Sequence, residues 1–221
     1  MKILIVVDMQ NDFVGSGALG TPESEKIIPN VFSKIKEYVR LGDIQKVENE
    51  NNDDTFGIDF SKNVFGLNSD KCTIIFTRDT HYKDSYKYTE EGKNLPIPHC
   101  LACTEGWYFI PEFDYFTKYG KIFNVIEKGT FGSDELIRHL QGLYKKFNIE
   151  SIELIGLCTD ICVIANTIIA KSALPNVPIY VDASCCAGTT PEMHDKAIEL
   201  MENSLQIHIL NKGLEPWRNT K

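Results

Sequence analysis

Apolar residues in this chain gather in short, nearly continuous runs, separated by longer stretches in which they recur every three or four positions. Short runs of this kind are typical of strands that are buried on both faces of a parallel sheet. Six strands are expected, at residues 2–7, 72–77, 121–126, 152–155, 177–181 and 206–210. Because they alternate with helical patterns, the sequence predicts an α/β fold in which helices cover both faces of a parallel sheet.

Capping residues and helical periodicity mark the helices between these strands. A helix is expected to start at Pro29 and to end near Gly42. Ser133 is a good cap for a second helix, and Thr190 caps a third that has Pro191 at its first position. These helices fill connections between successive parallel strands, as the predicted fold requires.

The helix after the fourth strand carries a cysteine in its first turn. Gly156 is expected to end the strand, and Thr159 is a good N-cap for the helix. Cys162 then falls at about the third helical position, where free N–H groups and the helix dipole favour the thiolate. The alternative is that Cys162 is a small buried apolar residue, which is the commoner role of a free cysteine.

A glycine-rich stretch follows the first strand. Gly15, Gly17 and Gly20 match the dinucleotide fingerprint G-x-G-x-x-G. The fingerprint requires its first glycine directly after the strand and a helix that opens on its last glycine, whereas about seven residues intervene here and Thr21 and Pro22 follow. We therefore interpret the stretch as a loop over the edge of the sheet.

Length and composition predict a single domain over residues 1–221, with a polar insertion at about 43–70. The chain is 43% hydrophobic and has a formal net charge of -8, without a cluster of Lys or Arg, which argues against a nucleic-acid or membrane partner. No apolar run has the length of a secretion signal or a membrane span, so a cytoplasmic location is expected. The sequence leaves a monomer and a homo-oligomer open.

Cysteine usage points to reduced thiols. An odd number of cysteines in a chain of this size, without a secretion signal, does not suggest a disulfide framework. Their spacing does not match a structural zinc site either. The seven positions are 72, 100, 103, 158, 162, 185 and 186.

Charged and nucleophilic side chains follow four of the predicted strands. Asp8 follows the first strand, Asp79 and His81 the second, Lys128 the third and Cys162 the fourth. Taken singly, each has a commoner structural role, such as capping a turn or facing solvent. The carboxyl ends of parallel strands form one ligand crevice, so together these residues predict a site at that edge.

Part of this set has the chemistry of a metal site. Asp79, His81 and the more distant His99 offer carboxylate and imidazole ligands, and Glu90 or Glu91 could add another. The alternative is that these are hydrogen-bonded loop residues, because metal motifs usually have tighter spacing.

Five motifs, in this order along the chain, resemble the isochorismatase-like cysteine hydrolases: DMQNDF, TRDTH, PIPHC, EKGTFGS and GLCTDICV. Within that family the chain most resembles the metal-bearing nicotinamidase/pyrazinamidase branch. The resemblance implies a three-layer α/β/α fold with a six-stranded parallel sheet of order 3-2-1-4-5-6. It also implies a cis peptide bond between Leu157 and Cys158.

The resemblance further implies an amidohydrolase that converts nicotinamide to nicotinate and ammonia through a cysteine thioester. Asp8, Lys128 and Cys162 would be the catalytic residues. The backbone N–H groups of Cys158 and Cys162 would form the oxyanion hole.

One divalent ion is implied as well, with zinc preferred over iron or manganese. Its ligands would be Asp79, His81 and His99, with Glu91 preferred to Glu90 as a further ligand. The ring of a small amide substrate could stack on aromatic residues near the catalytic residues in sequence, namely Phe13 and Phe131.

Other functions remain open from the sequence alone. One is a metal-free hydrolase of the same fold that acts on a carbamoyl, ureido or vinyl-ether substrate. A second is a redox or binding protein in which Cys162 is a sensor thiol. A third is a relative of the same fold without activity.

Overall fold

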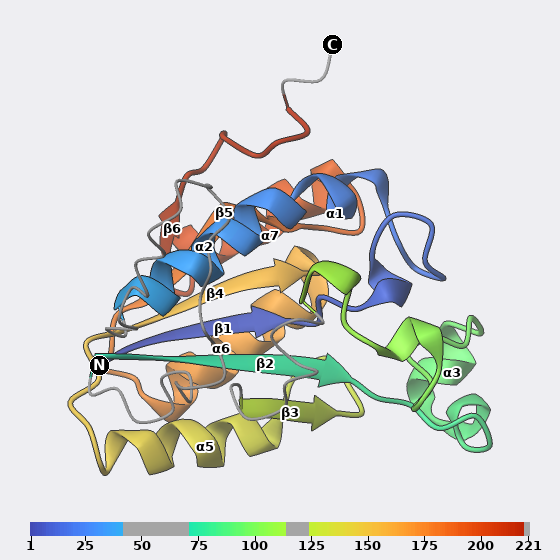
Figure 1. The fold of residues 1–221 in the computed structure, drawn as a ribbon, viewed down its shortest axis with the longest axis horizontal. Helices are drawn as coiled ribbons and strands as arrows, with labels where there is room; N and C mark the ends of the chain where they lie inside the picture. Colours follow the sequence, from blue (N-terminus) through green and yellow to red (C-terminus); the bar gives the residue numbers. More distant parts are fainter. Residues whose placement is uncertain (42–70, 114–123, 219–221) are drawn as a thin grey trace, which may run out of the picture.

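A six-stranded parallel sheet forms the centre of the molecule (Figure 1). The computed structural model describes residues 1–41, 71–113 and 124–218. The strands are β1 Lys2–Val7, β2 Cys72–Asp79, β3 Asn124–Lys128, β4 Ser151–Leu157, β5 Ile179–Ala187 and β6 His208–Leu210. Their order is β3-β2-β1-β4-β5-β6, which confirms the predicted order and the α/β fold class.

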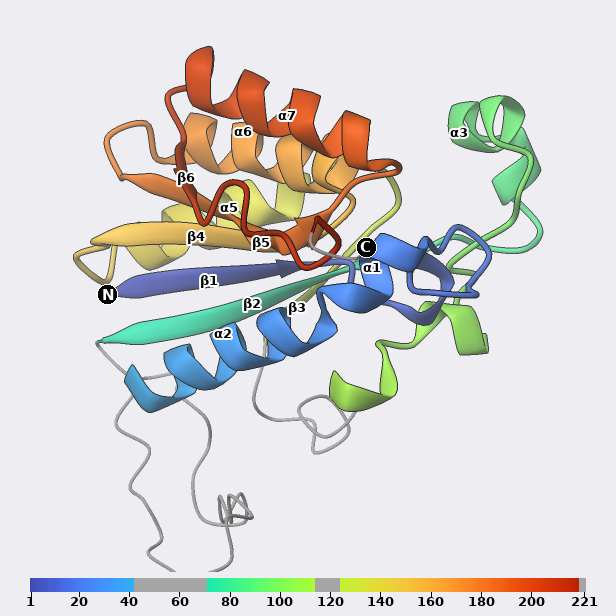
Figure 2. The same cartoon turned by 90° about the horizontal axis from the view of Figure 1, so that it is seen from above.

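Helices cover both faces of this sheet, as predicted (Figure 2). On one face lies α2 with the short α1, and on the other lie α5, α6 and α7. The helices are α1 Pro22–Lys26, α2 Ile28–Leu41, α3 Glu90–Asn94, α5 Asp134–Tyr144, α6 Ile164–Ala173 and α7 Pro191–Asn203. The central strand β1 is therefore shielded on both sides, and its residues from Ile3 to Val7 are fully buried.

Two helix starts confirm the capping residues expected from the sequence. The Ser133 side chain accepts a hydrogen bond from the N–H of Leu136 at the start of α5. Thr190 accepts one from Met193 at the start of α7, where Pro191 is the first helical residue. Directly after the glycine-rich loop, Thr21 opens the short helix α1 with a reciprocal capping box, a helix that the sequence pattern did not predict.

The sequence prediction placed the ends of several strands wrongly. The third strand was predicted at 121–126, but β3 runs from Asn124 to Lys128, so Lys128 is its last residue and does not follow it; 121–123 lie outside the described residues. This edge strand alternates exposed and buried side chains at Val125, Ile126 and Glu127, so a polar residue does not end it. β2 and β5 likewise continue past their predicted ends, through Asp79 and Ala187.

Gly156 does not end the fourth strand, which corrects the prediction. It lies inside β4 with φ of 116°, and the register between β4 and β5 shifts between Leu154 and Gly156. A Cβ atom at this position would lie 2.2 Å from the carbonyl oxygen of Val7. Glycine is therefore needed for a close approach of β4 to β1, in addition to its positive φ.

Some sequence expectations concern the molecule as a whole. The predicted polar insertion at 43–70 lies outside the described residues. All seven cysteines are free thiols. Within the described ranges, none of the helices combines the length and the apolar character that crossing a bilayer needs.

Candidate active site

The residues that follow the predicted strands meet at the carboxyl edge of the sheet, where the arrowheads in Figure 1 point. Asp8 directly follows β1, Lys128 ends β3, and Cys162 lies shortly after β4. The Lys128 Nζ atom is 2.6 Å from Asp8 Oδ2 and 3.5 Å from Cys162 Sγ. All three side chains are buried. The structure thus brings a thiol, a carboxylate and an ammonium group into one cluster.

Burial decides the protonation states in this cluster. Burial raises the pKa of Asp8, although Lys128 opposes the shift, and the Thr77 hydroxyl donates a hydrogen bond to Asp8 Oδ1 at 2.7 Å. Burial also raises the pKa of the Cys162 thiol well above its usual value, and Lys128 offsets this only in part. Burial lowers the pKa of Lys128, but Asp8 and Cys162 raise it by more, so Lys128 is protonated.

These directions correct one expectation about the thiol. The helix start was expected to favour the Cys162 thiolate, but burial raises the pKa of the thiol, and the Lys128 ammonium offsets this only in part. The free protein therefore holds Cys162 as a thiol at neutral pH. A nucleophilic role for Cys162 requires a neighbouring base. Of the two carboxylates that contact Lys128, Asp8 is the nearer to the ammonium, at 2.6 Å against 3.3 Å for Asp79.

The helical segment that carries Cys162 starts differently from the prediction. Thr159–Val163 form a π-helical turn, and α6 follows from Ile164. The residue before this turn is Cys158, whose carbonyl oxygen accepts hydrogen bonds from the N–H groups of Ile161 and Val163. Thr159 is thus the first helical residue and not the N-cap, and its hydroxyl pairs with His194. The peptide bond between Leu157 and Cys158 is cis, as predicted.

A second cluster contains Asp79, His81 and His99. Asp79 ends β2, and backbone hydrogen bonds tie His81 to the loop that carries His99, since the N–H of His81 donates to the carbonyl oxygen of Cys100 at 3.0 Å. Asp79 Oδ2 lies 3.0 Å from His81 Nε2 and 3.4 Å from His99 Nε2. The ligand atoms of the three residues all lie within 4.8 Å of one another.

Glu91 stands beside this cluster, and Glu90 does not. Glu91 carboxylate oxygens are 3.4 Å from His99 Nε2 and 3.8 Å from His81 Nε2. Glu90 is exposed and pairs with Lys93 on the surface of α3. Burial would lower the pKa of His99, but Asp79 and Glu91 raise it to about 10. The two carboxylates thus make the cluster a favourable place for positive charge.

The donor set of this cluster fits a divalent metal ion. His81 Nε2 is buried and has no well-oriented hydrogen-bond partner among the described residues, although it points at the carboxylates. The Nδ1 atom of His99 lies 2.9 Å from the Ile97 carbonyl oxygen, which leaves its Nε2 facing the cluster. A ligating histidine typically has its second ring nitrogen held in this way. Two imidazoles and one or two carboxylates suit a divalent transition metal.

The two aromatic residues expected near the substrate have different surroundings. Phe13 is buried, and its ring centroid lies 5.6 Å from that of His99. Phe131 is exposed by 46%, and its carbonyl oxygen accepts a hydrogen bond from Asn166 at 3.0 Å. Phe13 therefore borders the cluster of Asp79, His81 and His99, whereas Phe131 lies at the surface.

Comparison with known proteins identifies the family of the chain. The family profile of the isochorismatase domain matches residues 2–210. The chain belongs to the isochorismatase family. This match confirms the resemblance inferred from the five motifs.

Relatives within the isochorismatase family cover nearly the whole chain. The chain is 26% identical to the nicotinamidase of Saccharomyces cerevisiae over 228 residues, which cover 96% of this chain and 98% of that protein. It is 24% identical to the nicotinamidase of Schizosaccharomyces pombe over 230 residues, with 89% and 87% covered. The solved pyrazinamidase of Pyrococcus horikoshii, in complex with zinc, has a TM-score of 0.67 and 26% identity, and the match covers 95% of this chain and 98% of that one.

One residue that supports the site of this isochorismatase-family chain was not identified from the sequence. Gln10 Nε2 donates to the carbonyl oxygens of Asp79 and Trp107, and its Oε1 accepts from the N–H of Asp79 at 2.7 Å. It therefore fixes the backbone that presents Asp79 to the histidines. The available signal was a buried amide two residues after Asp8, in the motif DMQNDF.

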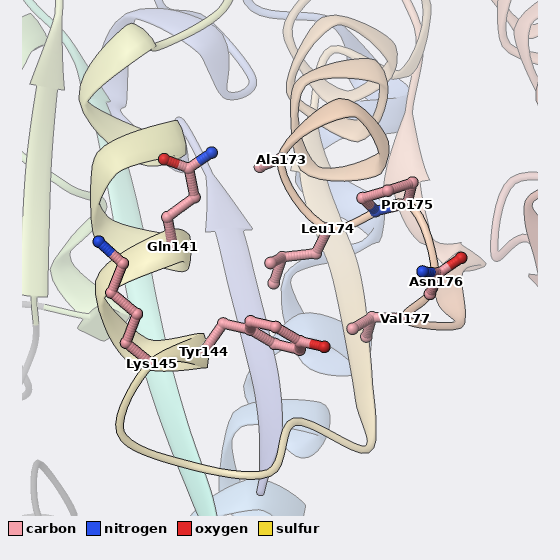
Figure 3. A pocket seen from close by; sticks show the side chains of 8 residues that line it. All are labelled: Gln141, Tyr144, Lys145, Ala173, Leu174, Pro175, Asn176 and Val177. Atoms are coloured by element: carbon pink, nitrogen blue, oxygen red, sulfur yellow. The ribbon is translucent and has the colours of Figure 1, made fainter.

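A surface cavity elsewhere on this isochorismatase domain lies far from the site. It has a volume of about 410 Å³ and lies between the C-terminal ends of α5 and α6 (Figure 3). Tyr144 faces it from α5, and Leu174 and Val177 face it from the segment that leads into β5. Because β5 starts there, this cavity belongs to the amino end of the sheet, opposite Cys162.

Proposed function

We propose that the protein is an amidohydrolase that converts nicotinamide to nicotinate and ammonia. The observation that carries the proposal is the buried Lys128 ammonium, 2.6 Å from Asp8 and 3.5 Å from Cys162, at the strand edge that also holds Asp79. A thiol with a raised pKa is inert unless a base takes its proton as it attacks. The full-length similarity to nicotinamidases supports the choice of substrate.

The first half of the reaction forms a thioester. Asp8 accepts the proton of Cys162 Sγ, and the sulfur attacks the carboxamide carbon. The raised pKa of Asp8 makes it a stronger base than an exposed aspartate. Lys128 contacts both groups, so one cation faces the negative charge as it moves from carboxylate to sulfur. In this proposal the backbone N–H groups of Cys158 and Cys162 bind the oxyanion.

The second half of the reaction restores the thiol. Asp8 returns its proton to the leaving nitrogen, and ammonia departs from the acyl group. Asp8 then removes a proton from a water molecule, which attacks the thioester carbon. Cys162 leaves as a thiolate and recovers the proton, so that nicotinate and the free enzyme result.

The proposed metal ligands are Asp79, His81, His99 and Glu91. A divalent ion held there, with zinc as the first choice given the ligand types, would supply a Lewis-acid position for the pyridine nitrogen of the substrate. Phe13, beside His99, and Phe131 would flank the substrate ring. A cytoplasmic location suits the proposal, because the protein carries seven free thiols that such a compartment keeps reduced.

Ammonia release tests the proposal. Wild type and Cys103→Ala, which removes an exposed thiol, should hydrolyse nicotinamide, and Cys162→Ala should not. Benzamide, which lacks the ring nitrogen, should be a poorer substrate. His81→Ala should lose stoichiometric metal and most nicotinamide hydrolysis. Full activity without metal would favour the metal-free hydrolase, and absence of any amide turnover would favour the sensor thiol.

A variant of the base tests the proton transfer separately. Asp8→Asn should lose hydrolysis, because an amide cannot take the thiol proton. Alkylation of Cys162 should be slowed more at pH 7 than at pH 9, where hydroxide ionises the thiol directly. Normal turnover by Asp8→Asn would reduce Asp8 to the role of a turn residue.

A further inference from the structure

A buried polar array lies behind the turn that carries Cys162, on the side of α7. The Thr159 Oγ1 atom lies 2.8 Å from His194 Nδ1, and His194 Nε2 lies 3.4 Å from Glu215 Oε1. All three residues have no exposed surface. A hydroxyl, an imidazole and a carboxylate thus contact one another in succession. The reaction proposed above uses none of them.

The charge on Glu215 fixes the direction of these hydrogen bonds. Burial raises the pKa of Glu215, but the Arg218 guanidinium, which donates a hydrogen bond to it, makes the net shift downward. The N–H of Gly213 donates to the same carboxylate at 3.1 Å. The ionised Glu215 holds the ring proton on His194 Nε2, so Nδ1 accepts the hydrogen bond from the Thr159 hydroxyl.

His194 is held in this neutral form by its surroundings. Burial lowers its pKa, and the charged groups that act on it are Glu215, Asp195 and Arg218. The ring of Trp217 packs edge-on against the imidazole, with centroids 5.0 Å apart. The segment after β6 therefore supplies both the carboxylate and the aromatic wall of the array.

A second link joins the same turn to α7. Asp160 accepts hydrogen bonds from the N–H of Thr189 at 2.8 Å and from its hydroxyl at 2.6 Å. The two elements approach so closely that a Cβ atom at Gly188 would lie 2.7 Å from the N atom of His194. Two consecutive residues of the π-helical turn, Thr159 and Asp160, are thus hydrogen-bonded to residues at the start of α7.

The position of Thr159 links this array to the turn that contains Cys162. Thr159 is the first residue of the five-residue turn that contains Cys162. Its hydroxyl pairs with His194, outside the turn, and so ties the first residue of the turn to α7. A buried polar array costs desolvation energy that an apolar core would not, so packing alone does not require these residue types.

We propose that Thr159, His194 and Glu215 are positioning residues that hold the turn so that the Cys162 sulfur faces Lys128. Glu215 sets the ring tautomer, the ring fixes the Thr159 hydroxyl, and the hydroxyl orients the turn. The inference rests on the proposed function, in that it explains how the nucleophile of that reaction is aimed.

Paired substitutions separate the two ends of the imidazole. The side-chain amide of His194→Asn reaches the place of Nδ1 and keeps the bond to Thr159, whereas that of His194→Gln reaches the place of Nε2 and keeps the bond to Glu215. Thr159→Ser keeps the hydroxyl, and Thr159→Val removes it at nearly equal volume. Glu192→Gln, on the exposed surface of α7, is the control.

Two rates are measured for each folded variant: nicotinamide hydrolysis, as kcat and KM, and alkylation of Cys162 by iodoacetamide, followed on its own peptide by mass spectrometry. His194→Gln and Thr159→Val should lower kcat and the alkylation rate about tenfold, the value of one buried hydrogen bond, with KM nearly unchanged. His194→Asn, Thr159→Ser and the control should stay near the wild-type rates.

Equal losses in His194→Asn and His194→Gln would overturn the proposal, because a merely structural histidine has no preferred end. So would a fall in melting temperature with unchanged rates in the folded protein. If wild type does not hydrolyse nicotinamide, the proposed function fails, but the alkylation rates still decide whether the array positions Cys162.

Discussion

Lys128→Met is the most informative change to the charge cluster. Methionine keeps most of the length of the side chain and removes its charge. Asp8 then stays fully buried and keeps the Thr77 hydroxyl as a donor, but it loses the cation 2.6 Å from Oδ2. Asp79 loses the same partner at 3.3 Å. One substitution thus leaves two carboxylates without their shared counter-charge.

The magnitude follows from the burial of the pair. Removing one member of a buried ion pair costs about 3–5 kcal/mol, because the other charge remains desolvated. For a protein of this size that corresponds to a fall in melting temperature of roughly 6–20 °C. Lys196→Met is the matched control: its partner Glu192 and Lys196 itself are both exposed, so the change should stay within about 0.5 kcal/mol.

The loss should depend on pH in a defined direction. The pKa of Asp8 is already raised by burial, and without Lys128 it rises further. A carboxyl group whose pKa is higher in the folded state binds more protons when folded, so it lowers stability as pH rises above its unfolded value near 4. The deficit of Lys128→Met relative to wild type should therefore be smaller at pH 5 than at pH 8.

Urea denaturation of Lys128→Met, of Asp8→Asn and of the double variant Asp8→Asn/Lys128→Met measures these free energies of unfolding. The double variant should recover at least about 1 kcal/mol relative to the sum of the single changes, because the second substitution removes the stranded charge. Strict additivity, or a deficit in Lys128→Met that does not change between pH 5 and pH 8, would refute the reasoning.

Two further predictions concern the metal cluster and the sheet. Glu91→Gln should lower the affinity for a divalent ion roughly 10–100-fold in equilibrium dialysis, and Glu90→Gln should not change it, because only Glu91 faces the histidines; equal effects would remove Glu91 from the ligand set. Gly156→Ala should cost at least about 2 kcal/mol in urea denaturation, because the added Cβ meets the β1 backbone at a positive φ. The control is Gly142→Ala in α5, where a Cβ atom would meet open space, so this change should be neutral or should stabilise the protein by up to about 1 kcal/mol. Similar losses of stability in Gly156→Ala and Gly142→Ala would contradict this account.

The sheet and the meeting of the site residues could be predicted because both depend on local pattern. Buried parallel strands are unbroken apolar runs, and the residue after each run lies at one edge of the sheet. Asp8, Asp79 and Cys162 were found in this way. Strand ends were less predictable: Lys128 belongs to an edge strand in which polar residues alternate, and Gly156 serves a close contact with β1 that its neighbours in sequence do not reveal.

The start of the turn that carries Cys162 was mispredicted for a related reason. Threonine is a residue type that often serves as an N-cap, but the Thr159 hydroxyl forms a hydrogen bond with His194, which is 35 residues away in sequence. The partner of that histidine comes from a segment near the end of the chain. Contacts between such distant segments leave no periodic signal, so the sequence pattern did not indicate this array.

Lys128 also connects the two clusters of the site. Its ammonium touches Asp79 Oδ1 at 3.3 Å, while the other oxygen of the same carboxylate faces His81 and His99. A cation taken up by the histidines would draw charge from Asp79 and leave the ammonium more fully to Asp8. If a divalent ion is bound there, its removal should therefore change the charge around Asp8 and Cys162 and slow even the hydrolysis of an amide such as benzamide, which has no ring nitrogen to bind.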